Sequence, residues 1–88
     1  MTHAFYSDAA EKARADLSPR ERAAVEDIRI SLESDPGRGE EVPDSGPGSS
    51  SYVVELLPEE TGGRGISILY RYDRALDAAL ITYLVAGP

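Results

Sequence analysis

The residues of this chain with the most chemical potential are arginines and tyrosines in its last third. Arg64, Arg71 and Arg74 are the only cations after residue 60, and Tyr70 and Tyr83 lie among them. Such side chains on a sheet face can stack on bases and neutralise phosphates, or form a hot spot for a protein partner. Tyr70 follows the alternation of buried strand positions and is predicted to complete the core. The candidate binding residues are therefore Arg64, Arg71, Arg74 and Tyr83, and no catalytic residue is assigned.

Other chemistries have little support in the sequence. His3 is the only histidine and cysteine is absent, so a zinc site would need unusual ligands, and a serine nucleophile has no conventional base. The glycines of 62–65 precede a predicted strand, whereas a phosphate-binding loop opens a helix. Neither a metal ion nor another cofactor is predicted.

The charge of the chain favours a protein partner over a nucleic acid. Its net charge is −7, and the first 60 residues carry 14 acidic and 6 basic side chains. Tight nucleic-acid binding needs several cationic phosphate contacts, so it is not expected here. The chain has no apolar run of the ~20 residues that a membrane helix needs. The N-terminus, Met1–Ala4, lacks the features of a signal peptide, so a cytoplasmic protein without membrane association is expected.

Two helices are predicted in the first 35 residues. Ser7 is a suitable N-cap for a helix that extends to about Asp16. The segment Ser18–Glu21 reads Ser-Pro-Arg-Glu, a capping box with proline at the first helical position. The second helix should end near Ser34-Asp35, because Pro36-Gly37 cannot continue it.

Three strands are predicted in the second half of the chain, over 52–57, 66–72 and 78–85. The segments fit a period of two and are rich in β-branched or aromatic side chains. The segment 75–85 also suits a helix at its start, but the β-forming residues 81–85 favour a strand. His3–Tyr6 could add an edge strand. The predicted core comprises Val25, Ile28, Leu32, Val54, Leu56, Ile68, Tyr70 and Leu80.

The connections between these elements complete a single domain over residues 1–88. Residues 36–50 are rich in Gly, Pro, Ser and acidic residues, which leave little to pack, and are predicted to form a mobile loop. Residues 58–65 are predicted to form a hairpin loop.

Two strand motifs resemble those of the RelE/ParE toxin superfamily. Residues 52–56, Tyr-Val-Val-Glu-Leu, are similar to a strand that the family often writes Tyr-x-x-Glu-Leu. Residues 65–73 are similar to a strand of the form x-x-Arg-Val-Leu-Tyr-Arg-x-Asp. The resemblance covers nearly the whole chain. It implies an α+β fold, with two N-terminal helices packed on a three- to four-stranded antiparallel sheet.

The departures from that family concern its catalytic cations. Ser67 and Leu57 stand where RNase members commonly carry arginine, and the chain stops at Ala86-Gly87-Pro88 without a basic tail. Those toxins cut mRNA with basic and tyrosyl groups that stabilise developing charge. The resemblance therefore implies a scaffold that binds a protein, either an antitoxin-like partner or a cellular target, without RNase activity.

Two alternatives stay open at this point. One is a ribosome-dependent mRNA endoribonuclease toxin of a type II toxin–antitoxin pair, with Arg64, Arg71 and Tyr83 as relocated catalytic candidates. The other is an unrelated small α+β interaction module with the same order of elements. The sequence also leaves a homodimer open.

Overall fold

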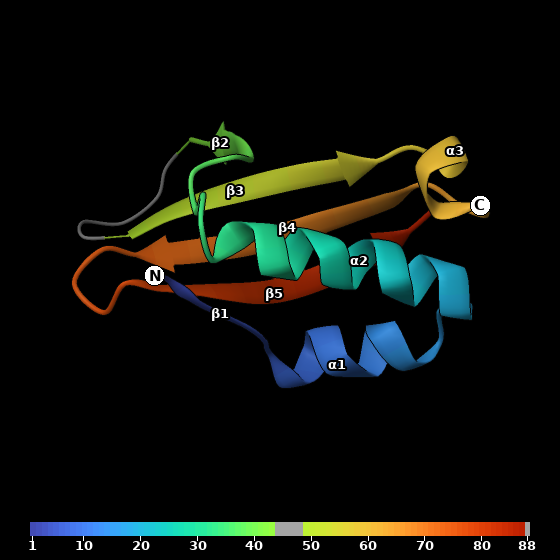
Figure 1. The fold of residues 1–88 in the computed structure, drawn as a ribbon, viewed down its shortest axis with the longest axis horizontal. Coiled ribbons are helices and arrows are strands. Elements are labelled where there is room, and N and C mark those ends of the chain that lie inside the picture. The colour runs from blue at the N-terminus through green and yellow to red at the C-terminus, as the bar shows by residue number, and fades with distance from the viewer. Residues whose placement is uncertain (44–48, 88) are drawn as a thin grey trace.

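The computed structural model describes residues 1–43 and 49–87 and confirms the predicted α+β class. Its sheet has five strands in the order β1-β5-β4-β3-β2 (Figure 1). The β2–β3, β3–β4 and β4–β5 pairs are antiparallel, whereas β1 runs parallel to β5. The elements in chain order are β1 (His3–Tyr6), α1 (Asp8–Ala15), α2 (Pro19–Leu32), β2 (Glu40–Val42), β3 (Ser49–Leu56), α3 (Pro58–Thr61), β4 (Ile66–Asp73) and β5 (Ala78–Ala86).

Both predicted helices begin at the serine caps that the sequence indicated. The Ser7 side chain accepts a hydrogen bond from the backbone N–H of Ala10. At α2, the Ser18 hydroxyl accepts from the Glu21 N–H while the Glu21 carboxylate accepts from the Ser18 N–H, so the capping box is complete. Helix α2 ends at Leu32, slightly before the predicted end.

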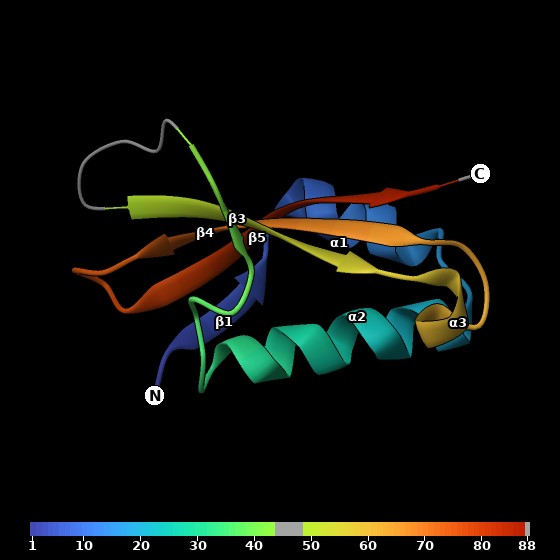
Figure 2. The same cartoon turned by 90° about the horizontal axis from the view of Figure 1, so that it is seen from above.

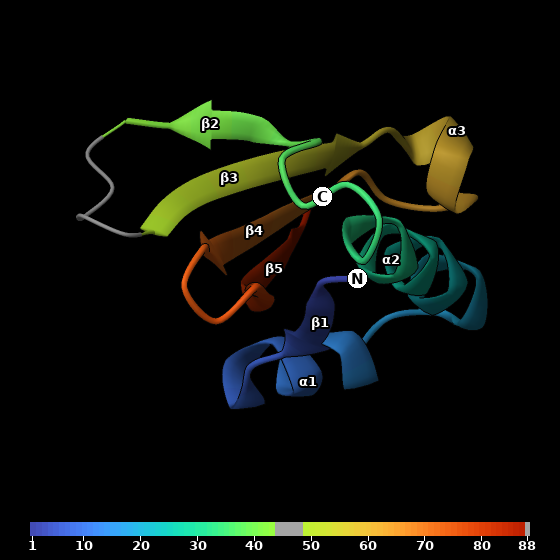
Figure 3. The same ribbon diagram turned by 60° about the vertical axis from the view of Figure 1, so that its left-hand side comes forward.

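The helices occupy different positions around the sheet. Helix α2 lies across one face of the sheet, as Figure 2 shows from above. Helix α1 lies beside β5, beyond the point where β1 leaves the sheet (Figure 3). In the described part of the chain, no helix covers the other face of β3, β4 and β5.

The core lies between α2 and the sheet, and it confirms seven of the eight predicted positions. Val25, Ile28 and Leu32 of α2 meet strand residues at inward positions of the sheet. Tyr70 is only 1% exposed and stacks on Tyr52, with ring centroids 5.2 Å apart. The confirmed residues are Val25, Ile28, Leu32, Val54, Leu56, Ile68 and Tyr70.

The prediction was wrong for Leu80, because a β-bulge changes which residues of β5 face inward. Leu69 pairs with Tyr83 and Tyr70 pairs with Ile81, so Thr82 is an extra residue in β5. The extra residue shifts the alternation by one position. Ile81 therefore faces the core, and Leu80 is partly exposed on the opposite face.

Two further elements lie inside segments that were predicted as loops. Strand β2 falls within 36–50 and pairs with residues 51–53 of β3. The phenolic oxygen of Tyr70 also holds this segment, since it donates to the Pro36 carbonyl at 2.7 Å and accepts from the Gly39 N–H at 3.0 Å. Residues 44–48 lie outside the described residues, and the mobility of 36–50 stays a prediction. The predicted hairpin loop 58–65 contains the short helix α3.

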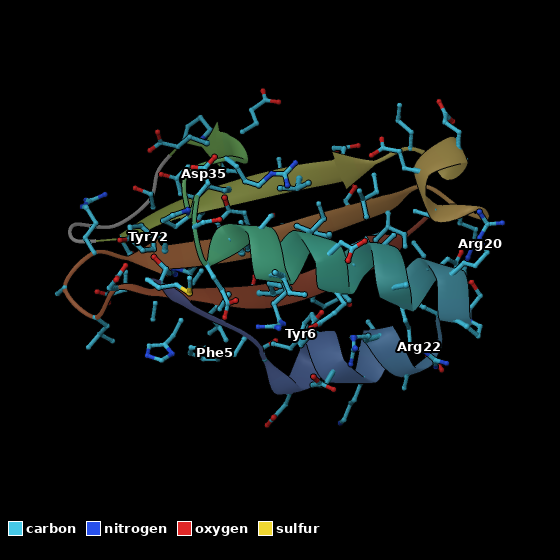
Figure 4. All side chains as sticks on the ribbon, viewed as in Figure 1. Phe5, Tyr6, Arg20, Arg22, Asp35 and Tyr72 are labelled. Atoms are coloured by element: carbon cyan, nitrogen blue, oxygen red, sulfur yellow. The ribbon has the colours of Figure 1, made fainter. Side chains whose placement is uncertain are left out.

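Strand β1 is bound on its outer side by α2. The Arg29 guanidinium donates to the Ala4 carbonyl at 2.8 Å, and the Thr2 N–H donates to the Glu33 carbonyl at 3.0 Å. Tyr6 lies between α1 and α2 (Figure 4), where its hydroxyl donates to Glu26. This parallel edge strand joins the N-terminus to both helices.

Candidate functional site

The sheet face opposite α2 is covered by no helix of the described residues, and we call it the open face. The strand registers place its residues in rows that run across the sheet. The central row is Glu40, Val53, Leu69 and Tyr83, and the neighbouring rows are Glu55, Ser67 and Val85 on one side and Ser51, Arg71, Leu80 and Phe5 on the other.

The open face exposes large apolar side chains next to one another. Leu69 is 37% exposed, Tyr83 53%, Val85 48% and Phe5 48%. Isolated exposed apolar residues are normal, but a contiguous group marks a surface for binding. The exposed residues of this face are therefore of the types found at the centre of protein interfaces.

A shallow groove lies at the β1 end of the open face. It has a volume of about 300 Å³, and apolar side chains from Phe5, Leu76 and Leu80 line it. Arg71 stands at its rim and donates a hydrogen bond to the Ser49 hydroxyl at 2.9 Å. The groove is wide enough for one apolar side chain beside a charged or polar contact.

The structure brings only two of the four predicted binding residues onto the open face. Arg71 and Tyr83 lie in adjacent rows of that face. Arg64 precedes β4 and Arg74 follows it, so the eight residues of that strand lie between them, a length of ~26 Å at 3.3 Å per residue. The three arginines therefore do not form one patch.

Arg64 is bound to a buried carboxylate. Its backbone N–H, Nε and Nη2 donate to Glu21 at 3.0, 3.2 and 3.1 Å, and Glu21 is only 3% exposed. Hydrogen bonds from the Arg64 side chain, and then from the Ser18 and Arg64 backbone, lower the pKa of Glu21 from 4.5 to about 2. Arg64 thus ties the α3–β4 connection to the start of α2.

Arg74 belongs to the end of the β4–β5 hairpin. Its Nη1 donates to the Ser50 hydroxyl at 3.2 Å. In the same turn, Asp77 has a positive φ of 49° and accepts hydrogen bonds from Thr2 and Tyr72. These hydrogen bonds hold the hairpin end, so Arg74 is placed to support the fold there.

Ser67 and Leu57, the two positions where the resemblance implies that an arginine is missing, lie at the other end of the open face. Ser67 stands between Glu55 and Val85 in one row, and Leu57 is 52% exposed at the start of α3. A second hollow of about 320 Å³ is lined by these residues and Pro58. Glu55 is the charged residue in that lining, so an anionic phosphate is not favoured there.

The described residues contain neither of two other kinds of site. No group of three His, Cys, Asp or Glu side chains there is arranged to hold a metal ion. Nor does any helix of that part have the length and apolar character needed to span a membrane.

Comparison with solved structures gives matches along the whole chain. The RelBE toxin–antitoxin complex of E. coli contains a chain that matches with a TM-score of 0.77 at 11% identity, covering 100% of this chain and 99% of that one. A RelBE complex from Mycobacterium tuberculosis matches with a TM-score of 0.69 at 21% identity, covering 98% of both chains. The RelE–RelB complex of Pyrococcus horikoshii matches with a TM-score of 0.73 at 15% identity, covering 98% and 96%.

These matches define the class of protein to which the structure corresponds, a small α+β domain with the RelE-like fold. At 21% identity or less, the likeness shows the fold alone. No family model and no curated protein matches this sequence.

Proposed function

We propose that this RelE-like protein acts by binding another protein through its open face, and that it does not cut mRNA. The observation that carries the proposal is the exposed group of Leu69, Tyr83 and Val85 on a face whose only cation, among the described residues, is Arg71. Interface centres are depleted in charge and enriched in aromatic residues. The group of Leu69, Tyr83 and Val85 has this composition, and the charged residues Glu40, Glu55 and Arg71 lie around it.

The partner is proposed to be antitoxin-like. Solved structures of the same fold are described as RelE–RelB or RelBE complexes, in which such a chain is held by a protein. A cellular target protein would use the same surface. In either case, Tyr83 and Arg71 are the expected hot-spot residues, because these residue types most often dominate binding energy.

The electrostatics argue against phosphodiester chemistry. Cleavage of RNA requires cations or hydrogen-bond donors at the sites where charge develops. The hollow at the α3 end of the open face is lined by Ser67, Leu57 and Glu55, none of which is a cation. Arg64 is bound to Glu21. The alternative, a ribosome-dependent endoribonuclease, is supported by the fold likeness.

The enzyme question is tested with purified protein, ribosomes and mRNA. We expect no cleavage above the no-protein control. Wild type is compared with a variant that carries Arg64→Ala, Arg71→Ala and Arg74→Ala. Robust cleavage that disappears in the triple variant would establish the endoribonuclease and refute the binding-only proposal.

The binding question is tested on the partner captured with the wild-type protein from the producing organism and then purified. Leu69→Asp and Tyr83→Asp each place a charge at the centre of the open face. We expect each to weaken the partner's affinity at least about tenfold, a loss of ~1.4 kcal/mol or more. Ile30→Asp is the matched control, because Ile30 is 48% exposed on α2, away from the open face. Equal loss in the control would reject the open face as the docking surface.

A further inference from the structure

We infer that the open face is built for a basic amphipathic helix, whose apolar stripe packs on Val53, Leu69 and Tyr83 and whose lysines or arginines meet carboxylates along the β2–β3 margin. This inference rests on the proposed function and specifies the chemistry of the partner. Its basis is the position of the acidic residues relative to the apolar ones.

The acidic margin consists of Glu40, Glu55 and Glu59. Glu40 is opposite Val53 in the β2–β3 register, Glu55 is two residues further along the same face of β3, and Glu59 lies in α3 immediately beyond. All three side chains are exposed. In the described ranges 1–43 and 49–87, none of the three is part of an ion pair.

Three carboxylates on the helical side of the molecule are paired with arginines. Glu21 is bound by Arg64, Glu26 by Arg29 at 2.7 Å, and Glu33 by Arg29 at 3.6 Å. The arginines of α2 and the β4 connection thus neutralise these three acids, whereas the exposed Asp8 and Asp27 of the helices have no ion pair among the described residues. In the part of the chain that the structure describes, no cation pairs with the acidic margin, so the margin can attract a cationic partner.

The size of the apolar area fits one helix. Val53, Leu69 and Tyr83 come from three adjacent strands, which span ~10 Å at the usual strand spacing, and a helix with its side chains is ~10–12 Å wide. Residues 49–55 of β3 give the open face a length along the strands of ~20 Å at 3.3 Å per residue, the length of a helix of ~13 residues. Val53 is the apolar open-face residue of that stretch, between Ser51 and Glu55.

The net charge of the whole chain favours a partner of positive charge. A net charge of −7 repels an acidic segment at long range and attracts a basic one. At close range, residues three and four apart on a helix share a side. Cations spaced in this way beside the apolar stripe would therefore follow the acidic margin from Glu40 to Glu55.

The test uses two synthetic helical peptides of ~14 residues, a length suited to the open face. Both carry the same leucine stripe, with lysine at the remaining positions in one and glutamate in the other. Each is titrated into the ¹⁵N-labelled protein and followed by amide chemical shifts. We expect the lysine peptide to shift the amides of Val53, Leu69 and Tyr83, with an affinity at least about tenfold above that of the glutamate peptide.

Substitutions at the margin separate local complementarity from general attraction. Glu40→Gln with Glu55→Gln should weaken the lysine peptide by about fivefold, as expected for two partly exposed charge pairs. The control, Asp8→Asn with Asp27→Asn, makes the same change in net charge at exposed positions of α1 and α2. We expect less than a twofold effect there.

The outcomes distinguish the two levels of the proposal. If both peptides shift the open face with equal affinity, or if the margin and control variants lose equally, the basic partner is wrong while docking on the open face stands. If neither peptide shifts the open face, or if the shifts fall on α1 and α2, then the docking face of the proposed function fails with it.

Discussion

The carboxylate of Glu21 serves two elements at once. It caps α2 through the Ser18 N–H and binds the guanidinium and backbone of Arg64, 43 residues later in the chain. The sequence indicates the first role through the Ser-Pro-Arg-Glu motif. It could not indicate the second, because nothing local links Glu21 to a residue beyond α3. Arg64 was therefore predicted as a binding residue, although its hydrogen bonds are directed into the fold.

Replacement of Glu21 by Gln should change the response of the protein to acid. The folded pKa of about 2 lies below the ordinary 4.5. The ionised carboxylate therefore stabilises the fold above pH 4.5, and this contribution is lost as pH falls towards 2. We expect Glu21→Gln to lower stability at pH 7 and to flatten the decline between pH 4.5 and 2. Urea unfolding at several pH values measures this.

The control for that experiment is Glu59→Gln, since Glu59 is exposed in α3 and forms no ion pair among the described residues. It should leave both the free energy of unfolding at pH 7 and the acid profile unchanged. An identical acid profile in wild type and Glu21→Gln would show that Arg64 does not stabilise the ionised form.

Replacement of Tyr70 by Phe should loosen the segment that precedes β2. The change keeps the buried ring but leaves the Pro36 carbonyl and the Gly39 N–H without their side-chain partner. We expect a loss of ~1–3 kcal/mol in urea unfolding and faster exchange of the Gly39 amide. Tyr83→Phe is the control, because Tyr83 is 53% exposed. If Gly39 exchanges at the wild-type rate, this contact does not hold the segment.

Helices and strands were predictable wherever local residues mark where the element begins or ends. Both long helices have serine caps, and α2 also has proline at its first position. Strands β3, β4 and β5 show clear alternation. Strand β2 was missed because Glu-Glu-Val has weak strand preference, and its pairing with β3 determines its conformation. The parallel pairing of β1 with β5 likewise depends on contacts distant in sequence.

The bulge at Thr82 explains the one error in the predicted core. Periodicity assumes that every residue of a strand advances the alternation by one, and an extra residue breaks that assumption. Thr82 instead donates from its hydroxyl to the Leu69 carbonyl. The bulge keeps Leu84 buried while Tyr83 points outward, and so it determines which β5 residues form the open face.

Helix α2 provides a matched pair of isoleucines for testing the core. Ile28 is 7% exposed among the strand residues, whereas Ile30 is 48% exposed. Ile28→Ala should cost ~2–5 kcal/mol, because it removes buried methyl groups and leaves a cavity. Ile30→Ala should stay within ~0.5 kcal/mol. Denaturant unfolding measures both, and equal costs would contradict the placement of α2.

The distribution of charge over the molecule was only partly predictable. Composition gave the excess of acid and favoured a protein partner. It could not show that Glu40 and Glu55 share a face, or that Leu69 lies beside Tyr83. Those relations depend on the strand registers. Two residues of the candidate site, Arg71 and Tyr83, were thus proposed from the sequence. The residues beside them on the open face could be named only from the structure.

The net charge of −7 should also prevent RNA binding. Nonspecific nucleic-acid binders have dissociation constants of ~10⁻⁴–10⁻⁶ M at physiological salt, through several phosphate contacts. We expect a fluorescent single-stranded RNA to bind more weakly than this range in anisotropy titrations. Arg71→Ala should make no difference, and binding within that range that Arg71→Ala abolishes would contradict the expectation.

The contacts at the outer side of β1 have a consequence for how the molecule behaves at high concentration. Sheets with bare edges tend to add strands from other copies and grow into fibres. Here Arg29 occupies the Ala4 carbonyl at one edge, while the other edge strand is three residues long and carries Glu40 and Glu41. Neither edge is a good template for polymerisation. The chain can therefore expose its apolar face without offering a template for amyloid-like growth.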